Sequence, residues 1–130
     1  MRRLSPVLAF LLLAGCADTG GGDETARKWV VFFRQDDATV SRPASIVVAT
    51  AAQVARRHPD RGLVVAGFAA AHGNIDADQA LSSDRADAVA AALRASGVPA
   101  NQITEHARPP ANEAPAVAAR RVEISFAPVP

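Results

Sequence analysis

Apolar side chains gather in four short segments of the chain, and two longer segments between them show a different periodicity. Residues 29–33 and 63–68 are nearly continuous apolar runs, Trp-Val-Val-Phe-Phe and Leu-Val-Val-Ala-Gly-Phe. Runs of this length and composition are typical of buried strands. Residues 121–126 alternate polar and apolar side chains, which predicts a half-buried strand. Residues 102–105 predict a further, short strand.

The first of the longer segments predicts a helix. Ser41 is suited to cap its N-terminus, and Pro43 lies in the first turn, where proline is tolerated. Ile46 and Val54 fall on one face at helical spacing, so we expect that face to be buried. The helix should end before the His-Pro pair at 58–59, because a residue that precedes proline avoids the α region.

The second longer segment predicts another helix. Asp76 is placed to open it as part of a capping pair with the glutamine three residues later. Leu81, Val89 and Leu93 form an apolar stripe that alanines complete. Gly97 follows the last periodic position, as a C-terminal glycine stop does.

The predicted order is strand, helix, strand, helix, strand, strand, which indicates an α+β fold. A strand, a crossover helix and a second strand form a βαβ unit, so the first two strands should be parallel. The last strand should make the sheet mixed, and both helices should cover the same face. We therefore expect a two-layer β-α-β-α-β-β sandwich.

The N-terminal residues predict export and lipidation. Two arginines at 2–3 precede a mostly apolar stretch at 4–13, which is too short to span a bilayer but fits an export signal. Leu-Ala-Gly-Cys at 13–16 resembles the bacterial lipobox, in which the cysteine is lipidated. Cys16 is the only cysteine, so no internal disulfide can form. An ordinary secretory signal with an incidental cysteine is the alternative.

These features divide the chain into three parts. We expect a lipoprotein signal peptide at 1–15, a lipidated flexible tether at 16–27 that contains three consecutive glycines, and a globular domain at 28–127. The tether would hold the domain in the periplasm, with the membrane as a partner through the lipid on Cys16. By resemblance to sorted lipoproteins, Ala17 after the cysteine implies the outer membrane.

Composition removes several classes of function. The formal net charge is +1, which gives no electrostatic basis for binding nucleic acid. The three histidines, His58, His72 and His106, lack the spacing of metal ligands, so we expect no metal site and no cofactor. No nucleophile with its base and no phosphate-binding loop is visible, so we do not expect an enzyme.

Several motifs together resemble one known family. They are Val-Ala-Gly at 65–67, Gln-Ala-Leu-Ser at 79–82, Arg-Ala at 85–86, Gly-Val-Pro at 97–99 and Arg-Arg-Val-Glu-Ile at 120–124. Their order and spacing resemble the C-terminal domain of the OmpA family, which also occurs in peptidoglycan-associated lipoproteins. The resemblance covers most of the chain after the predicted tether.

The resemblance implies non-covalent binding of the peptidoglycan stem peptide. In that family a loop aspartate holds the ammonium of diaminopimelate, and a helix arginine holds its carboxylate. Arg85 falls at the arginine position. Arg120 and Arg121 match the closing arginines, but on an alternating strand only one of them can face the ligand.

The acidic half of this arrangement is changed. Ala70 occupies the family's aspartate position. Asp78 is the replacement we expect, although an acidic residue in a first helical turn is equally explained by the helix dipole, and helix capping explains Asp76 better. Two functions follow: an outer-membrane lipoprotein that tethers the membrane to peptidoglycan, or an envelope lipoprotein that has lost this binding and contacts other envelope proteins.

Overall fold

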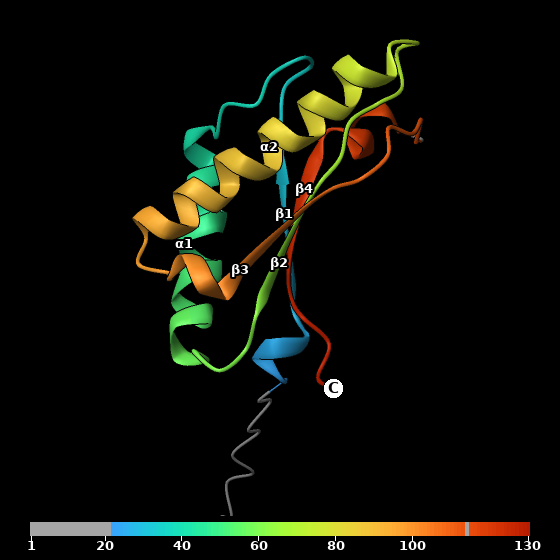
Figure 1. Cartoon of the computed structure of the whole chain (residues 1–130). Coiled ribbons are helices and arrows are strands. Elements are labelled where there is room, and N and C mark those ends of the chain that lie inside the picture. Colours follow the sequence, from blue (N-terminus) through green and yellow to red (C-terminus); the bar gives the residue numbers. More distant parts are fainter. Residues whose placement is uncertain (1–21, 114) are drawn as a thin grey trace, which may run out of the picture.

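The protein is described here by a computed structural model that covers residues 22–113 and 115–130 (Figure 1). The predicted signal peptide and Cys16 lie outside these residues. In the described part of the chain, no helix combines the length and the apolar character needed to cross a membrane.

A four-stranded mixed sheet forms one layer. Its strands are β1 (Lys28–Phe32), β2 (Leu63–Gly67), β3 (Ile103–Ala107) and β4 (Arg121–Phe126). The spatial order is β1-β4-β2-β3, with β4 antiparallel to both of its neighbours and β2 parallel to β3. The last strand therefore lies between β1 and β2, which run in the same direction. This confirms the predicted mixed sheet.

Two helices, α1 (Arg42–Arg57) and α2 (Ile75–Ala95), form the other layer and cover one face of the sheet (Figure 1). Between the layers lies a core of small apolar side chains, with Val31, Val65, Val89 and Ile124 almost inaccessible to solvent. The two-layer α+β fold expected from the sequence is confirmed.

The buried face of α1 agrees only in part with the predicted one, because Val54 is buried as expected but Ile46 is not. Ser41 caps the helix as expected, because its Oγ accepts from the Ala44 amide at 3.3 Å. Ile46, however, is 65% exposed, and the face that packs on the core is centred on Val48 and Ala51. Small side chains on this face allow α1 to approach the sheet closely, which periodicity alone did not indicate.

The start of α2 also differs from the prediction. Asn74 caps the helix by accepting from the Ala77 amide at 3.1 Å, so Asp76 lies in the first turn and does not cap it. Farther along, α2 packs directly on the end of β2. A Cβ built on Gly67 would lie 2.0 Å from the Ser82 carbonyl oxygen. The glycine permits this contact, which brings the next turn of α2, and Arg85 in it, over the end of the sheet.

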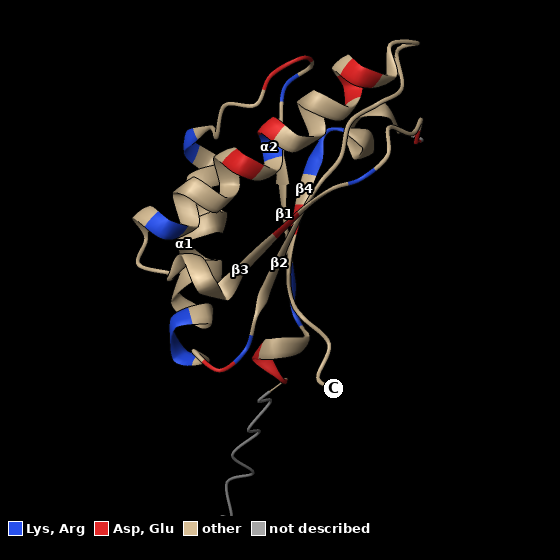
Figure 2. Ribbon diagram, in the orientation of Figure 1, with Lys and Arg blue, Asp and Glu red and all other residues tan. Residues whose placement is uncertain are grey.

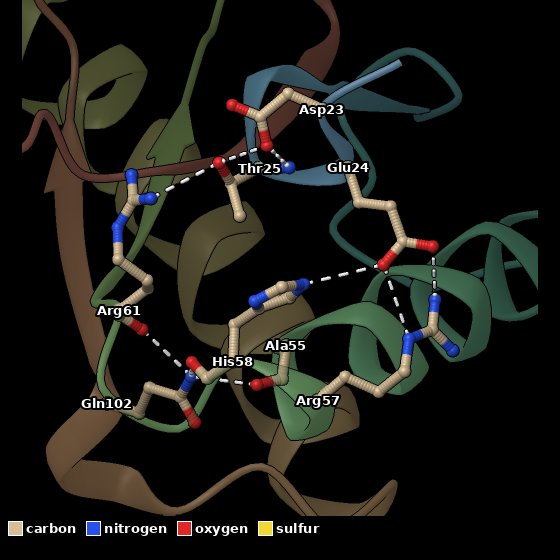
Figure 3. Close-up of polar contacts among 8 residues, drawn as sticks. All are labelled: Asp23, Glu24, Thr25, Ala55, Arg57, His58, Arg61 and Gln102. Carbon is tan, nitrogen blue, oxygen red and sulfur yellow. Dashed lines mark hydrogen bonds and ion pairs between the residues drawn. The ribbon is translucent and has the colours of Figure 1, made fainter. Parts of the chain in front are cut away.

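The described part of the predicted tether is docked on the domain. A 3-10 turn, η1 (Glu24–Ala26), precedes β1, and Glu24 lies 2.8 Å from Arg57 and 3.4 Å from His58 at the end of α1 (Figure 3). Arg61 donates to the Thr25 hydroxyl at 3.2 Å. The folded unit therefore includes η1, which lies before the predicted boundary at residue 28, because this turn has its own partners on the domain.

Candidate ligand-binding site

A pocket of about 130 Å³ lies at the end of the sheet where β1 and β2 finish and α2 begins. We call it the α2 pocket. It is lined by Gln35, Asp36, Ala70, His72, Leu81, Arg85, Ala116 and Arg120. Three segments that are distant in the sequence meet here: the turn after β1, the loop before α2, and the 3-10 turn η3 (Ala116–Ala119) that precedes β4.

Arg85 forms the floor of the α2 pocket and is only 1% exposed. Its Nε donates to the Asp37 carbonyl at 2.8 Å, its Nη1 to the Phe68 carbonyl at 3.0 Å and its Nη2 to the Arg34 carbonyl at 3.1 Å. Its guanidinium also lies 5.5 Å from the centroid of the Phe33 ring. A guanidinium has five N–H donors, so two remain after these three bonds. Arg85 therefore links the loops around the pocket, and two of its N–H groups form no bond with a described residue.

The charge around Arg85 is mixed. Burial, and to a smaller extent the neighbouring Arg120 cation, lower the pKa of Arg85, while Asp36 raises it. An arginine remains protonated in proteins despite such shifts, so the pocket holds two cations and one carboxylate. A fixed anion near fixed cations can recognise a zwitterionic ligand without making or breaking a bond.

The structure distinguishes the two closing arginines. Arg120 lines the α2 pocket, and its buried Nε has no hydrogen-bond partner within residues 22–113 and 115–130. Arg121 points elsewhere: it pairs with Glu113 at 2.7 Å and Glu123 at 3.3 Å, and its guanidinium lies 3.8 Å from the centroid of the Phe68 ring. Arg121 is the first residue of β4, whereas Arg120 lies just before the strand, at the end of η3, and is the one on the pocket side.

Both carboxylate oxygens of Asp78 contact the loop before α2. One of its carboxylate oxygens accepts from the His72 amide at 2.7 Å, and the other lies 3.0 Å from the His72 Nδ1. The first of these bonds is the main reason that the pKa of Asp78 is lowered. Asp78 does not line the α2 pocket. Its contacts give it a role in positioning the loop, with His72 as the loop residue that reaches the pocket.

Asp36 is the pocket carboxylate that sequence reasoning did not assign. Its φ of 54° lies in the left-handed region, which few residues other than glycine adopt. The available signal was its place in the turn that follows β1, a strand that runs in the same direction as β2. Both turns then emerge at the same end of the sheet, which brings Asp36 and Ala70 to one pocket.

Charged residues are spread over the domain, and acidic segments lie in the middle of α2 as well as at its start (Figure 2). Within the described ranges no cluster of three or more histidine, cysteine, aspartate or glutamate side chains could hold a metal ion. The α2 pocket is a small cavity in which two arginines and one aspartate lie beside apolar side chains.

The sequence profile of the OmpA family matches residues 32–122. This range includes both helices, all of β2 and β3, the last residue of β1 and the start of β4. The chain belongs to the OmpA family.

Among proteins of known sequence, the chain is similar to the probable lipoprotein YiaD of Escherichia coli K12, with 31% identity over 106 residues. The match covers 76% of this chain and 48% of that protein, so the chain spans about half the length of this relative.

Two solved structures share the fold. The peptidoglycan-associated lipoprotein of Burkholderia pseudomallei aligns with a TM-score of 0.69 at 24% identity, covering 76% of this chain and 90% of that one. The C-terminal domain of Helicobacter pylori MotB aligns with a TM-score of 0.66 at 20% identity, covering 76% and 83%.

Proposed function

We propose that this protein is a lipid-anchored envelope protein that binds peptidoglycan non-covalently through the α2 pocket. The observation that carries the proposal is the pairing of Arg85 and Arg120 with Asp36 around one small cavity. The two arginines would hold a carboxylate of the stem-peptide diaminopimelate, and Asp36 would hold the adjacent ammonium. Asp78 then acts through His72, by fixing the loop that carries Ala70.

The positions of the two ends of the domain support a tethering role. The turn η1, close to where the described chain begins, contacts the C-terminal end of α1 and so lies at the end of the domain opposite the α2 pocket (Figure 1). A domain attached through Cys16 to the outer membrane would therefore have its pocket at the end away from the attachment. This orientation suits a protein that spans the gap between the membrane and the peptidoglycan layer.

One observation favours the second function, an envelope interaction protein without peptidoglycan binding. Three of the five Arg85 donors are already used by main-chain carbonyls, and Ala70 offers no charge. Under this alternative, Arg85 is purely structural and the pocket is a remnant. The two functions differ in whether the remaining pocket charges bind a ligand.

The test is sedimentation of the full chain, purified in detergent micelles, with purified sacculi. We expect wild-type protein to sediment, free meso-diaminopimelate to compete, and Arg120→Gln to weaken binding about tenfold, since a hydrogen bond to a charged group contributes about 1.5–3 kcal/mol. Asp36→Asn should weaken it as well. Arg121→Gln is the matched control, because its side chain contacts Glu113 and Glu123 instead of the pocket.

Samples without sacculi correct for micelle aggregation, and thermal denaturation confirms that each variant is folded. Wild-type protein that stays in solution with sacculi would refute the proposal and favour the interaction protein. Equal loss in Arg120→Gln and Arg121→Gln would refute the assigned pocket.

A further inference from the structure

A second, larger cavity adjoins the α2 pocket. It has a volume of about 640 Å³ and lies between the end of β1, the loop that follows, and the first turn of α1. We call it the β1 groove. It is lined by Phe32, Phe33, Arg34, Asp37, Thr39, Ser41, Arg42, Pro43 and Arg120. None of these residues except Arg120 lines the α2 pocket.

The β1 groove is strongly basic. Arg34, Arg42 and Arg120 contribute three cations, and none of them forms an ion pair with another described residue. Asp37 is the one acidic residue of the lining, and its carboxylate accepts from the Thr39 amide at 2.8 Å. The positive end of the α1 dipole adds to the cationic character of the groove. Basic residues with no internal partner make this groove suited to an anion.

The two cavities share one wall. The carbonyls of Arg34 and Asp37 accept hydrogen bonds from Arg85, so the turn between them separates the floor of the α2 pocket from the β1 groove. Arg120 reaches both cavities. The turn separates the two cavities on one side, and on the other side Arg120 lines both, so a ligand held at Arg120 can reach the groove there.

We infer that the β1 groove binds a second carboxylate of the same ligand, and that Arg34 and Arg42 are its binding residues. This inference rests on the proposed function of the α2 pocket. In a stem peptide, the residue before diaminopimelate is a γ-linked glutamate, whose α-carboxylate is free. Where the other carboxyl of diaminopimelate is bound to D-alanine, this group is the next free carboxylate along the ligand from the one assigned to Arg85. The groove would thus select stem peptides with a free α-carboxylate over those in which it is amidated.

The test uses two synthetic peptides, L-Ala-γ-D-Glu-meso-diaminopimelyl-D-Ala and the same peptide with the glutamate α-carboxylate converted to an amide. Isothermal titration calorimetry on the full chain in detergent micelles gives both affinities. We expect the free acid to bind about tenfold more tightly, at the lower end for a hydrogen bond to a charged group because the groove is open to solvent. The ratio should fall as salt rises.

Variants then assign the preference to the groove. The double variant Arg34→Gln with Arg42→Gln should bind both peptides equally, with the affinity for the amidated peptide unchanged. Arg56→Gln, in the last turn of the same helix, is the matched control and should keep the tenfold ratio.

Equal affinity of wild-type protein for the two peptides would overturn this inference and leave the proposed function intact. Failure to bind either peptide would overturn both. A tenfold ratio that survives in the double variant would overturn the assignment to the groove.

Discussion

At each end of the sheet, one buried side chain donates hydrogen bonds to three main-chain carbonyls. We call the end of the domain that carries η1 the tether end. There, Gln102 Nε2 forms hydrogen bonds with the last turn of α1 and the turn that follows it. Its two N–H donors are shared among the carbonyls of Ala55, His58 and Arg61, which lie 2.8–3.0 Å from the nitrogen (Figure 3). At the pocket end, Arg85 serves the carbonyls of Arg34, Asp37 and Phe68. Gln102 and Arg85 therefore each hold the loops at one end of the sheet by hydrogen bonds to main-chain carbonyls.

The two ends differ in what their remaining charges do. At the tether end the charges contact one another: Glu24 pairs with Arg57 and His58, and Arg61 lies over the Phe126 ring. At the pocket end Arg120 has a buried Nε without a described partner. Charges that are paired within the domain contribute to its stability, whereas charges left without a partner are available to a ligand.

The largest effect should come from Arg85→Met, which removes the polar contacts at the pocket end. Leaving a buried acceptor unsatisfied costs about 1–3 kcal/mol, so we expect a loss of about 3–5 kcal/mol in the free energy of unfolding. Urea titration with the fluorescence of Trp29, the only tryptophan, which packs in the core, measures it. A loss below about 1 kcal/mol would show that Arg85 does not hold the loops.

Gln102→Met makes the matched change at the tether end and should cost less, about 2 kcal/mol, because a neutral donor is lost instead of a charged one. The same urea titration applies. Sedimentation of the folded variant with sacculi should be unchanged, since Gln102 lies at the opposite end from both cavities. Loss of sacculus binding in this folded variant would mean that binding also depends on the tether end, contrary to the assignment to the pocket end.

Arg120→Gln should separate binding from stability. The substitution removes a buried donor that has no described partner and a cation that disfavours the charge on Arg85. We therefore expect the melting temperature to stay the same or rise, while affinity for sacculi falls about tenfold. This trade-off is typical of functional residues. A clear drop in melting temperature would mean that Arg120, like Arg85, is part of the scaffold.

Local patterns predicted the elements well because each depends on near neighbours. The Ser41 cap, the alternation of β4 and the glycine stop at 97 are all read within a few residues. On α1 the prediction was right for Val54 and wrong for Ile46, because alanines, which carry little weight in a hydrophobic pattern, form the contact that leaves Ile46 exposed.

The candidate site was only partly predictable because it is assembled by tertiary contacts. The family motif located Arg85, and strand alternation showed that one of Arg120 and Arg121 faces inward, without indicating which. Asp36 came from a different loop, and Asp78 was removed from the pocket by a contact with His72 six residues earlier. Which polar group remains free depends on what every loop around it contributes, and sequence spacing does not contain that information.

The smallest effect concerns the ion pairs at the tether end. Hydrogen bonds from Arg57 and then His58 lower the pKa of Glu24 below its ordinary value. The folded state thus favours the ionised carboxyl. This stabilisation is fully present above the ordinary pKa of about 4.5 and is lost as the pH falls through the lower, folded-state value. Glu24→Gln should therefore melt slightly below wild type at pH 7 and level with it at pH 3.

Melting curves of both proteins across this pH range provide the measurement, and the difference between them cancels the acid sensitivity of all other carboxyls. Asp60→Asn is the control, because Asp60 is an exposed carboxyl in the turn after α1 that forms no ion pair with a described residue. A deficit of Glu24→Gln that persists at pH 3 would mean that η1 is held by packing. The ion pairs at the tether end would then contribute no more to the stability of the domain than the charges around the pocket do.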